Sequence, residues 1–149
     1  MSNEAGLYRL TYVSRNAMAG QAHQLDEEIG RILASSRRNN ARVGVTGALL
    51  FSADCFAQAL EGGSITVQDL FEQIQWDTRH ADSVVLEAGP VERREFADWS
   101  MAYAGRLEND HFRFNALAGD RSATDGVAGA GQVMGLLRNV VLRAPPAFV

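Results

Sequence analysis

The chain has 149 residues, about the length of one domain. Its 46% hydrophobic and 21% charged residues are the balance of an ordinary globular protein. The 14 basic residues are outnumbered by 18 acidic ones, and the net charge of -4 argues against binding to nucleic-acid phosphates as the main task. Every basic residue is arginine, which excludes Schiff-base chemistry, a covalent pyridoxal site and a Walker lysine.

Cysteine and histidine usage excludes further kinds of site. Cys55 is the only cysteine, so no internal disulfide can form, and its simplest role is that of a small apolar strand residue. The histidines, His23, His80 and His111, lack metal-ligand spacing, so we expect no metal. The first residues lack the basic and apolar regions of a secretory signal, and no apolar stretch could span a bilayer. We therefore expect a cytoplasmic protein without a membrane segment.

The first half of the chain predicts a strand, a helix and a hairpin. A run of β-forming residues predicts a first strand over 7–13. Apolar residues at helical spacing, with acidic residues in the first turn, predict a helix over 24–38 that is broken at 39–40. Two β-rich runs, 43–51 and 55–60, are separated by a short polar turn and predict a hairpin.

The next segments predict one more helix and two more strands. Ser64 is a candidate cap for a second helix with a single apolar stripe, which should end within 76–80. Strands are expected over 83–91 and 96–103, separated by a charged link. Trp99 would then lie within the last of these strands.

The C-terminal third predicts two helices, over 111–117 and 126–142, on either side of a segment rich in Gly, Ala, Ser and Asp. The resulting order, β-α-β-β-α-β-β, predicts an α+β fold with a ferredoxin-like sheet. The first two helices should cover one face of this sheet, and the C-terminal helices have the other face available. No internal repeat or second domain is indicated.

Five short segments stand in a characteristic order along the chain. They are 10–14 (LTYVS), 39–40 followed by 44–47 (NN and GVTG), 56–62 (FAQALEG), 77–80 (DTRH) and 96–101 (FADWSM). Each segment alone is weak evidence for a family, because such short motifs occur by chance. The ordered set, however, resembles the BLUF family of blue-light sensors that use FAD. The resemblance spans about residues 7–104. It implies a flavin-binding domain over 1–104 and a helical extension over 105–149 that belongs to the same compact unit.

The resemblance also implies which residues form the site. Gln58 would lie between Tyr12 and the flavin, with Trp99 and Met101 on the last strand nearby. The residues implied to bind the cofactor are Ile32, Ser36, Asn39, Asn40, Gln58, Ile74, Asp77, Arg79 and His80. Gln73 stands where some relatives have a basic residue near the phosphates, so FMN or riboflavin remain alternatives to FAD.

A function follows from the resemblance. Light would rearrange the hydrogen bonds between Tyr12, Gln58 and the flavin, because a glutamine amide can both donate and accept. This would shift the flavin absorption to the red without a net redox change. The change would pass through the last strand to the C-terminal helices and a protein partner. The resemblance thus implies a photoreceptor that is not an enzyme and forms a homo-oligomer. From the charge, the N-terminus and the lack of a long apolar stretch we expect it to be cytoplasmic and to contact neither nucleic acid nor membrane.

The residues themselves leave other interpretations open. Tyr12 is more simply a core strand residue, and Trp99 and Met101 would share one face of a strand and pack in the core. Gln58 is harder to explain in this way, because a glutamine in an apolar strand needs partners when buried. A small acylphosphatase-type enzyme would need a loop arginine, for which Arg15 is the nearest candidate. A cofactor-free interaction domain is the third alternative, and only the photoreceptor should be yellow.

Overall fold

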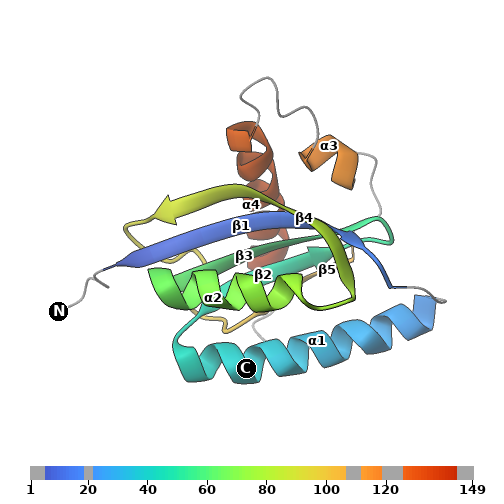
Figure 1. Cartoon of the computed structure of the whole chain (residues 1–149), viewed down its shortest axis with the longest axis horizontal. Coiled ribbons are helices and arrows are strands. Elements are labelled where there is room, and N and C mark those ends of the chain that lie inside the picture. The colour runs from blue at the N-terminus through green and yellow to red at the C-terminus, as the bar shows by residue number, and fades with distance from the viewer. Residues whose placement is uncertain (1–5, 19–21, 107–111, 119–125, 144–149) are drawn as a thin grey trace.

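A single mixed sheet of five strands, in the spatial order β4-β1-β3-β2-β5, forms the centre of the molecule (Figure 1). The computed structural model describes residues 6–18, 22–106, 112–118 and 126–143. In chain order the elements are β1 (Leu7–Asn16), α1 (Ala22–Val43), β2 (Thr46–Phe51), β3 (Cys55–Gly63), α2 (Ser64–Gln75), β4 (His80–Pro90), β5 (Ala102–Arg106), α3 (Phe114–Ala118) and α4 (Gly126–Arg143).

The register of the sheet brings chemistry-bearing residues side by side. β1 pairs antiparallel with both β3 and β4, and β2 and β3 form the predicted hairpin. Only the pair β2–β5 is parallel among the described strands. Tyr12 on β1 lies directly opposite Gln58 on β3, and Gln58 in turn lies opposite Leu49 on β2. These three side chains therefore share one face of the sheet.

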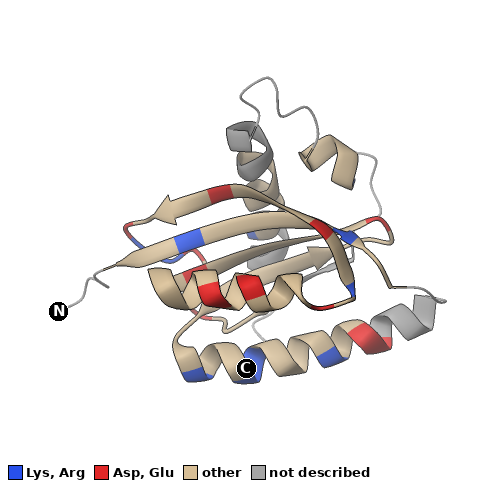
Figure 2. Ribbon diagram, viewed as in Figure 1, with Lys and Arg blue, Asp and Glu red and all other residues tan. Residues whose placement is uncertain are grey.

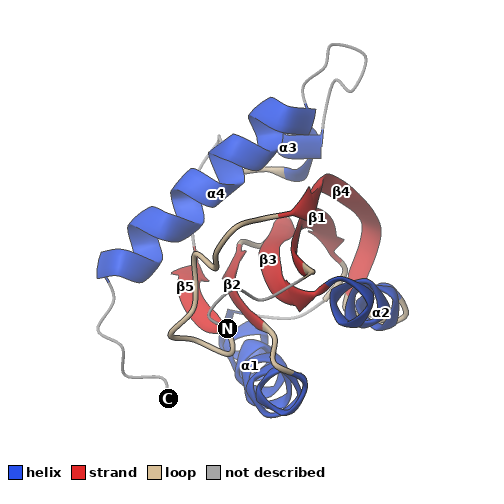
Figure 3. Ribbon diagram, turned by 90° about the vertical axis from the view of Figure 1, so that its left-hand side faces the viewer, coloured by secondary structure: helices blue, strands red, loops and turns tan. Residues whose placement is uncertain are grey.

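The helices cover both faces of the sheet, as predicted. Figure 3 shows α1 and α2 on one side and α3 and α4 on the other. Each side has its own core, because side chains alternate between the two faces along each strand. The core under α1 and α2 includes Leu10, Leu49, Phe51, Phe56, Leu60, Val67 and Phe71. The core under α3 and α4 includes Val13, Ala57, Phe96, Phe112, Leu117, Val133 and Leu137. The α+β, ferredoxin-like fold is therefore confirmed.

Two helix boundaries differ from the prediction. α1 continues through Asn39 and Asn40 and ends at Val43, because the Asn40 amide is held by a distant backbone carbonyl instead of capping the helix. Gly44 follows with φ of 73°, the left-handed conformation in which glycine commonly terminates a helix. Ser64 is the first residue of α2 and not its cap, since Gly63 occupies the cap position without a side-chain hydrogen bond.

The last strand was predicted to begin too early. β5 starts at Ala102, and the segment 91–101 is a connection instead of a strand. Its backbone groups bond to partners outside any ladder: the Trp99 carbonyl accepts from Gly47 N–H at 3.2 Å and the Ser100 carbonyl from the Asn40 side chain at 2.9 Å. Trp99 and Met101 therefore do not lie on a strand.

Some predicted features are only partly described. The helix expected over 111–117 begins at Phe114, and His111 lies outside the described residues. Cys55 is buried in β3, as expected for an apolar strand residue. Within the described segments, no helix has both the length and the apolar character needed to cross a membrane.

Candidate functional site

A cavity of about 180 Å³ lies between α1, α2 and the sheet. Every residue that the family resemblance assigns to the cofactor lines it. The resemblance did not assign five further lining residues to the cofactor, namely Ser35, Leu49, Leu60, Leu70 and Gln73, and it placed Gln73 only near the phosphates. The helical spacing offered a signal for Leu70, which is one helical turn before Ile74 on α2. Leu60 likewise lies two residues from Gln58 on the same strand face.

Gln58 is the buried polar group at the wall of this cavity, with 4% of its surface exposed. Its Oε1 accepts a short hydrogen bond from the Tyr12 hydroxyl, and its Nε2 lies 3.4 Å from the Met101 sulfur. These two partners fix the amide with its carbonyl end toward Tyr12. An amide nitrogen carries two N–H donors, so the second one remains for an acceptor in the cavity.

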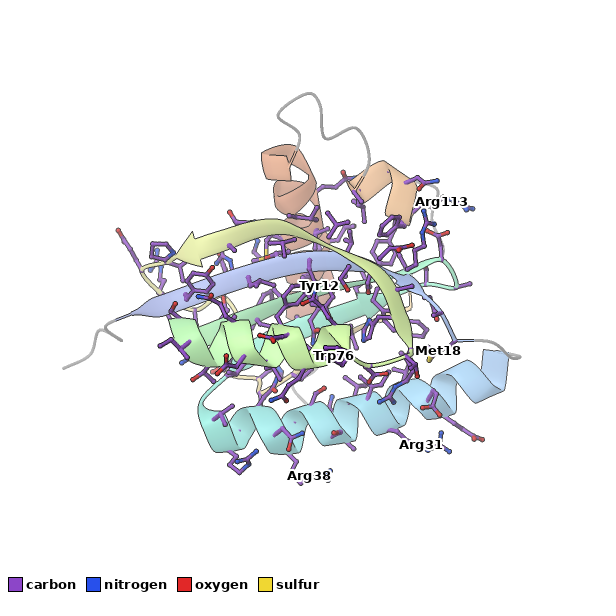
Figure 4. All side chains as sticks on the ribbon, in the orientation of Figure 1. Tyr12, Met18, Arg31, Arg38, Trp76 and Arg113 are labelled. Atoms are coloured by element: carbon purple, nitrogen blue, oxygen red, sulfur yellow. The ribbon has the colours of Figure 1, made fainter. Side chains whose placement is uncertain are left out.

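Tyr12 is fully buried, and Figure 4 shows it on β1, above α2 in that view. Its ring lies 4.9 Å from that of Phe71 on α2. Burial raises the pKa of Tyr12 far above its ordinary value of 10, and the nearby Asp77 carboxylate adds to the effect. The phenol therefore stays protonated and serves as a donor to Gln58.

Asn40 connects the cavity to the segment before β5. Its side chain is 1% exposed and donates from Nδ2 to the Ser100 carbonyl at 2.9 Å. One turn earlier on α1, Arg37 Nε donates to the Met101 carbonyl at 3.1 Å. The C-terminal half of α1 therefore holds the backbone that carries Met101.

Met101 and Trp99 lie in different layers, although a shared strand face was predicted. Met101 is 1% exposed and belongs to the core under α1 and α2, where its sulfur meets Gln58. Trp99 is partly buried and packs against the core under α3 and α4. The prediction failed because the backbone of this connection does not alternate as a strand does. The connection instead carries side chains from one core to the other.

A charged network stands at the rim of the cavity. Arg79 donates to both carboxylate oxygens of Asp77 at 2.8–3.2 Å and to Glu28 of α1 at 3.1 Å. The hydrogen bond from Arg79 lowers the pKa of Asp77, and the same contact raises the pKa of Arg79. Glu28 was not predicted, because its partner is 51 residues away in the sequence. The rim therefore joins α1 to the end of α2.

His80 lies behind this rim, close to Tyr12. Its Nδ1 is 2.9 Å from Ser14 Oγ, and its ring packs on Phe56 with centroids 4.7 Å apart. Burial lowers the pKa of His80 from the ordinary value of 6.5, the Asp77 charge opposing and the Arg79 charge adding to the effect. The imidazole is therefore neutral near pH 7.

Stability is expected to fall as the pH drops below 6.5. The unfolded chain binds a proton at this histidine more readily than the folded one, so acid favours unfolding until the folded pKa is reached. Asp77 does not change the stability in this pH range, because its carboxyl group takes up a proton only below its ordinary pKa of 3.8. Urea unfolding at about pH 7.5 and about pH 5.5 should show a smaller loss of stability in His80→Asn than in the wild type. An equal loss in both proteins would contradict this assignment.

The sequence matches a known family and parts of several longer proteins. The family model described as "Sensors of blue-light using FAD" matches residues 7–102. The photoactivated adenylate cyclase subunit beta of Euglena gracilis is 37% identical over 102 residues, which is 67% of this chain and 12% of that protein. Subunit beta of Euglena longa is 31% identical over 104 residues. The chain spans only 12% of the length of these relatives.

Solved structures of similar proteins extend the likeness to the C-terminal helices. The BLUF protein BlrB in its dark state is 31% identical, with a TM-score of 0.65, and 87% of this chain and 95% of that one are covered. The ground state of BlsA is 27% identical, with a TM-score of 0.68 over 96% of this chain and 94% of that one. The chain therefore belongs to the BLUF family of flavin-binding blue-light sensors.

Proposed function

We propose that this chain is a blue-light photoreceptor that binds FAD in the cavity between α1 and α2 and signals through the hydrogen bonds of Gln58. One observation carries the proposal: the buried Gln58 amide, at the cavity wall, is held between the Tyr12 hydroxyl and the Met101 sulfur. A buried amide in an apolar strand needs such partners, and these partners leave it one donor for a ligand.

The residues around the cavity fit a flat aromatic ring with one polar edge. Its walls are apolar, and its edges offer both donors and acceptors. The apolar lining residues are Ile32, Leu49, Leu60, Leu70 and Ile74. The polar ones are Ser35, Ser36, Asn39, Asn40, Gln58, Gln73, Asp77, Arg79 and His80. The apolar side chains suit the faces of a ring, and the polar ones, which are the larger group, suit its hydrogen-bonding edge and the polar chain attached to it.

The chemistry divides between cofactor and protein. A bound flavin supplies the absorption of blue light and an excited state that accepts electrons. Tyr12 is a neutral phenol that would release its proton along the hydrogen bond to Gln58 Oε1 only on giving up an electron, and the return of an electron and a proton to Tyr12 would close the cycle without net redox change. Gln58 can then turn or change tautomer, which alters the end of the amide that faces the cavity. The contact between Gln58 Nε2 and the Met101 sulfur changes at the same time.

A second cavity supports FAD as the cofactor. It has a volume of about 320 Å³ and shares Asn39, Leu70 and Gln73 with the first, so the two adjoin along the groove between α1 and α2. Arg42 of α1 lines it, on the basic C-terminal half of α1 that Figure 2 shows beside the acidic residues of α2. Asp69 of α2 lines the same space, so Arg42 offers one guanidinium for a phosphate beside a carboxylate, in place of a basic residue at position 73.

We further propose that residues 1–104 are the flavin-binding part and that 105–149 form a helical extension of the same unit, which reports to a protein partner. The matched relatives named as adenylate cyclases are much longer than this chain. The match covers 12% of their length, and we propose a sensory and not a catalytic role for the matched residues, in the cytoplasm and as a homo-oligomer. The acylphosphatase-type alternative is not favoured, because Arg15 is engaged by Asp82, Asn115 and the Phe114 ring.

The proposal is tested by the colour of the protein. Purified in the dark, the wild type should be yellow, and blue light should move its absorption to the red, with full return in darkness. Chromatography of the chromophore released by heat should identify FAD. A protein that stays colourless after incubation with FAD, FMN and riboflavin would contradict the photoreceptor function. Release of FMN or riboflavin would contradict only the choice of FAD.

A further inference from the structure

The connection 91–101, called the strap below, joins β4 to β5, which are the two edges of the sheet (Figure 1). It places side chains in both cores. Phe96 is 1% exposed in the core under α3 and α4, and Trp99 packs against the same core. Met101 lies in the opposite core, against Gln58. The strap is therefore in contact with both the candidate flavin site and the C-terminal helices.

The N-terminal part of the strap is held by the Glu61 carboxylate. Glu61 is completely buried, on the face of β3 opposite to Gln58. Its Oε2 accepts from the backbone N–H of Glu95 at 2.7 Å, and its Oε1 accepts from that of Phe96 at 3.0 Å. Hydrogen bonds to a carboxylate are stronger than neutral ones, and a buried carboxylate with several donors is a rigid anchor.

Other groups complete this anchor. The Thr46 hydroxyl on β2 donates to Glu61 Oε1 at 3.1 Å and accepts from Arg94 Nη1 at 2.9 Å. Arg94 Nη1 also donates to the Glu61 carbonyl at 3.2 Å, and Arg9 of β1 places a guanidinium nitrogen 3.7 Å from Glu61 Oε2. The anchor thus ties three neighbouring strands to residues 94–96 of the strap.

The strap also reaches α4 from this anchor. Glu95, whose N–H is bound by Glu61, pairs through its own carboxylate with Arg138 of α4 at 3.7 Å. Phe96 belongs to the same buried cluster as Val133 and Leu137 of α4. α4 is therefore packed against the part of the strap that Glu61 fixes.

The other end of the strap is held differently. There, Asn40 and Arg37 of α1 hold the backbone carbonyls of Ser100 and Met101, and the Met101 side chain meets Gln58 through a sulfur contact at 3.4 Å, which is a weak hydrogen bond. A change at Gln58 removes or moves this contact, while the anchor at Glu61 lies on the other face of the sheet and is untouched. A displacement of the Met101 side chain passes along the strap to α4 only while the end of the strap bound by Glu61 keeps its position.

We propose that Glu61 is the positioning residue of the signal relay, holding the strap so that a displacement of Met101 reaches Trp99 and α4 instead of being absorbed in the connection. This inference rests on the proposed function, because it needs light to alter Gln58. It assigns Glu61 no contact with the cofactor. The spectral change should therefore not depend on Glu61, whereas the response of α4 should.

The test measures both readouts in one sample. Absorption spectra report the red shift, and hydrogen exchange of peptides within 126–143 in darkness and under blue light reports α4. Glu61→Gln replaces the acceptor oxygen that holds Glu95 or Phe96 by an amide nitrogen. It should keep the red shift and reduce the light-dependent exchange difference of α4 by about fivefold or more, at the lower end of ordinary coupling between sites.

Glu87→Gln is the matched control. Glu87 pairs with the same Arg9 at 3.6 Å on an exposed part of β4 and has no hydrogen bond or ion pair with the strap among the described contacts, so this variant should behave as the wild type. An α4 response in Glu61→Gln equal to that of the wild type would overturn the proposal. So would a loss of the red shift in Glu61→Gln, which would place its role at the flavin site.

Two further outcomes are also decisive. If Glu61→Gln does not fold, Thr46→Val takes its place, since it keeps the carboxylate and removes one of its donors. It should retain the red shift with a weakened α4 response, and an unchanged response would overturn the proposal. A wild type with a red shift but no α4 response would overturn the relay alone. A wild type without a red shift would contradict the proposed function itself.

Discussion

Replacing Gln58 with leucine is expected to abolish the light-induced red shift while the protein still folds and binds flavin. Leucine fills a similar volume in β3, so the apolar neighbours of Gln58 keep their packing. The Tyr12 hydroxyl loses its acceptor and the Met101 sulfur loses its donor. No group that can exchange a donor for an acceptor then remains between Tyr12 and the cavity. Absorption spectra in darkness and after blue light measure the result.

The stability of this variant should fall only moderately. A buried hydroxyl without its acceptor costs about 1–3 kcal/mol, which a stable domain tolerates. Gln68→Leu is the matched control, because Gln68 lies on the exposed side of α2 and bonds only Ser64 among the described contacts. It should retain the full red shift. A red shift that persists in Gln58→Leu would show that the amide is not the switching group.

The layered fold was predictable because its signals are local. Apolar residues recur at the spacing of a helix in α1 and α2 and form β-rich runs in the first three strands, and each pattern is carried by near neighbours. Nine of the fourteen residues lining the cavity were implied by the resemblance to the BLUF family, not by these patterns. Helix ends were less predictable. Asn40 has the side chain of a helix terminator, but its amide is bound by Ser100, 60 residues away, and α1 continues to Val43.

The strap and its anchor could not be predicted either, because their partners also lie far away in the sequence. Trp99 and Met101 stand two residues apart, the spacing of neighbours on one strand face, but they pack in different layers. Glu61 has the position of an ordinary charge near the end of a strand. Its donors are the backbone groups of residues 95 and 96, which no side-chain pattern reveals. The register of β2 and β3, which the structure shows, places Thr46 opposite Glu61 and so explains one of these contacts.

Gly47→Ala is expected to produce the largest loss of stability. A Cβ atom built on Gly47 would overlap the backbone carbonyl oxygen of Ala59 on β3 and lie 3.4 Å from the Met101 methyl group. A strand carbonyl cannot move away without breaking its ladder, and Gly47 N–H also holds the Trp99 carbonyl. We expect a loss on the order of 3 kcal/mol in urea unfolding, at the upper end of ordinary single substitutions.

Gly30→Ala separates this close contact from the general effect of adding a methyl group. Gly30 lies on the exposed side of α1, and nothing stands within 4 Å of a Cβ built there. Alanine in an exposed helix interior should therefore raise the stability by about 0.5–1 kcal/mol, because glycine loses more backbone freedom on folding. The two variants should thus shift the urea midpoint in opposite directions. A midpoint for Gly47→Ala equal to that of the wild type would mean that β2 and β3 do not approach as closely as their register requires.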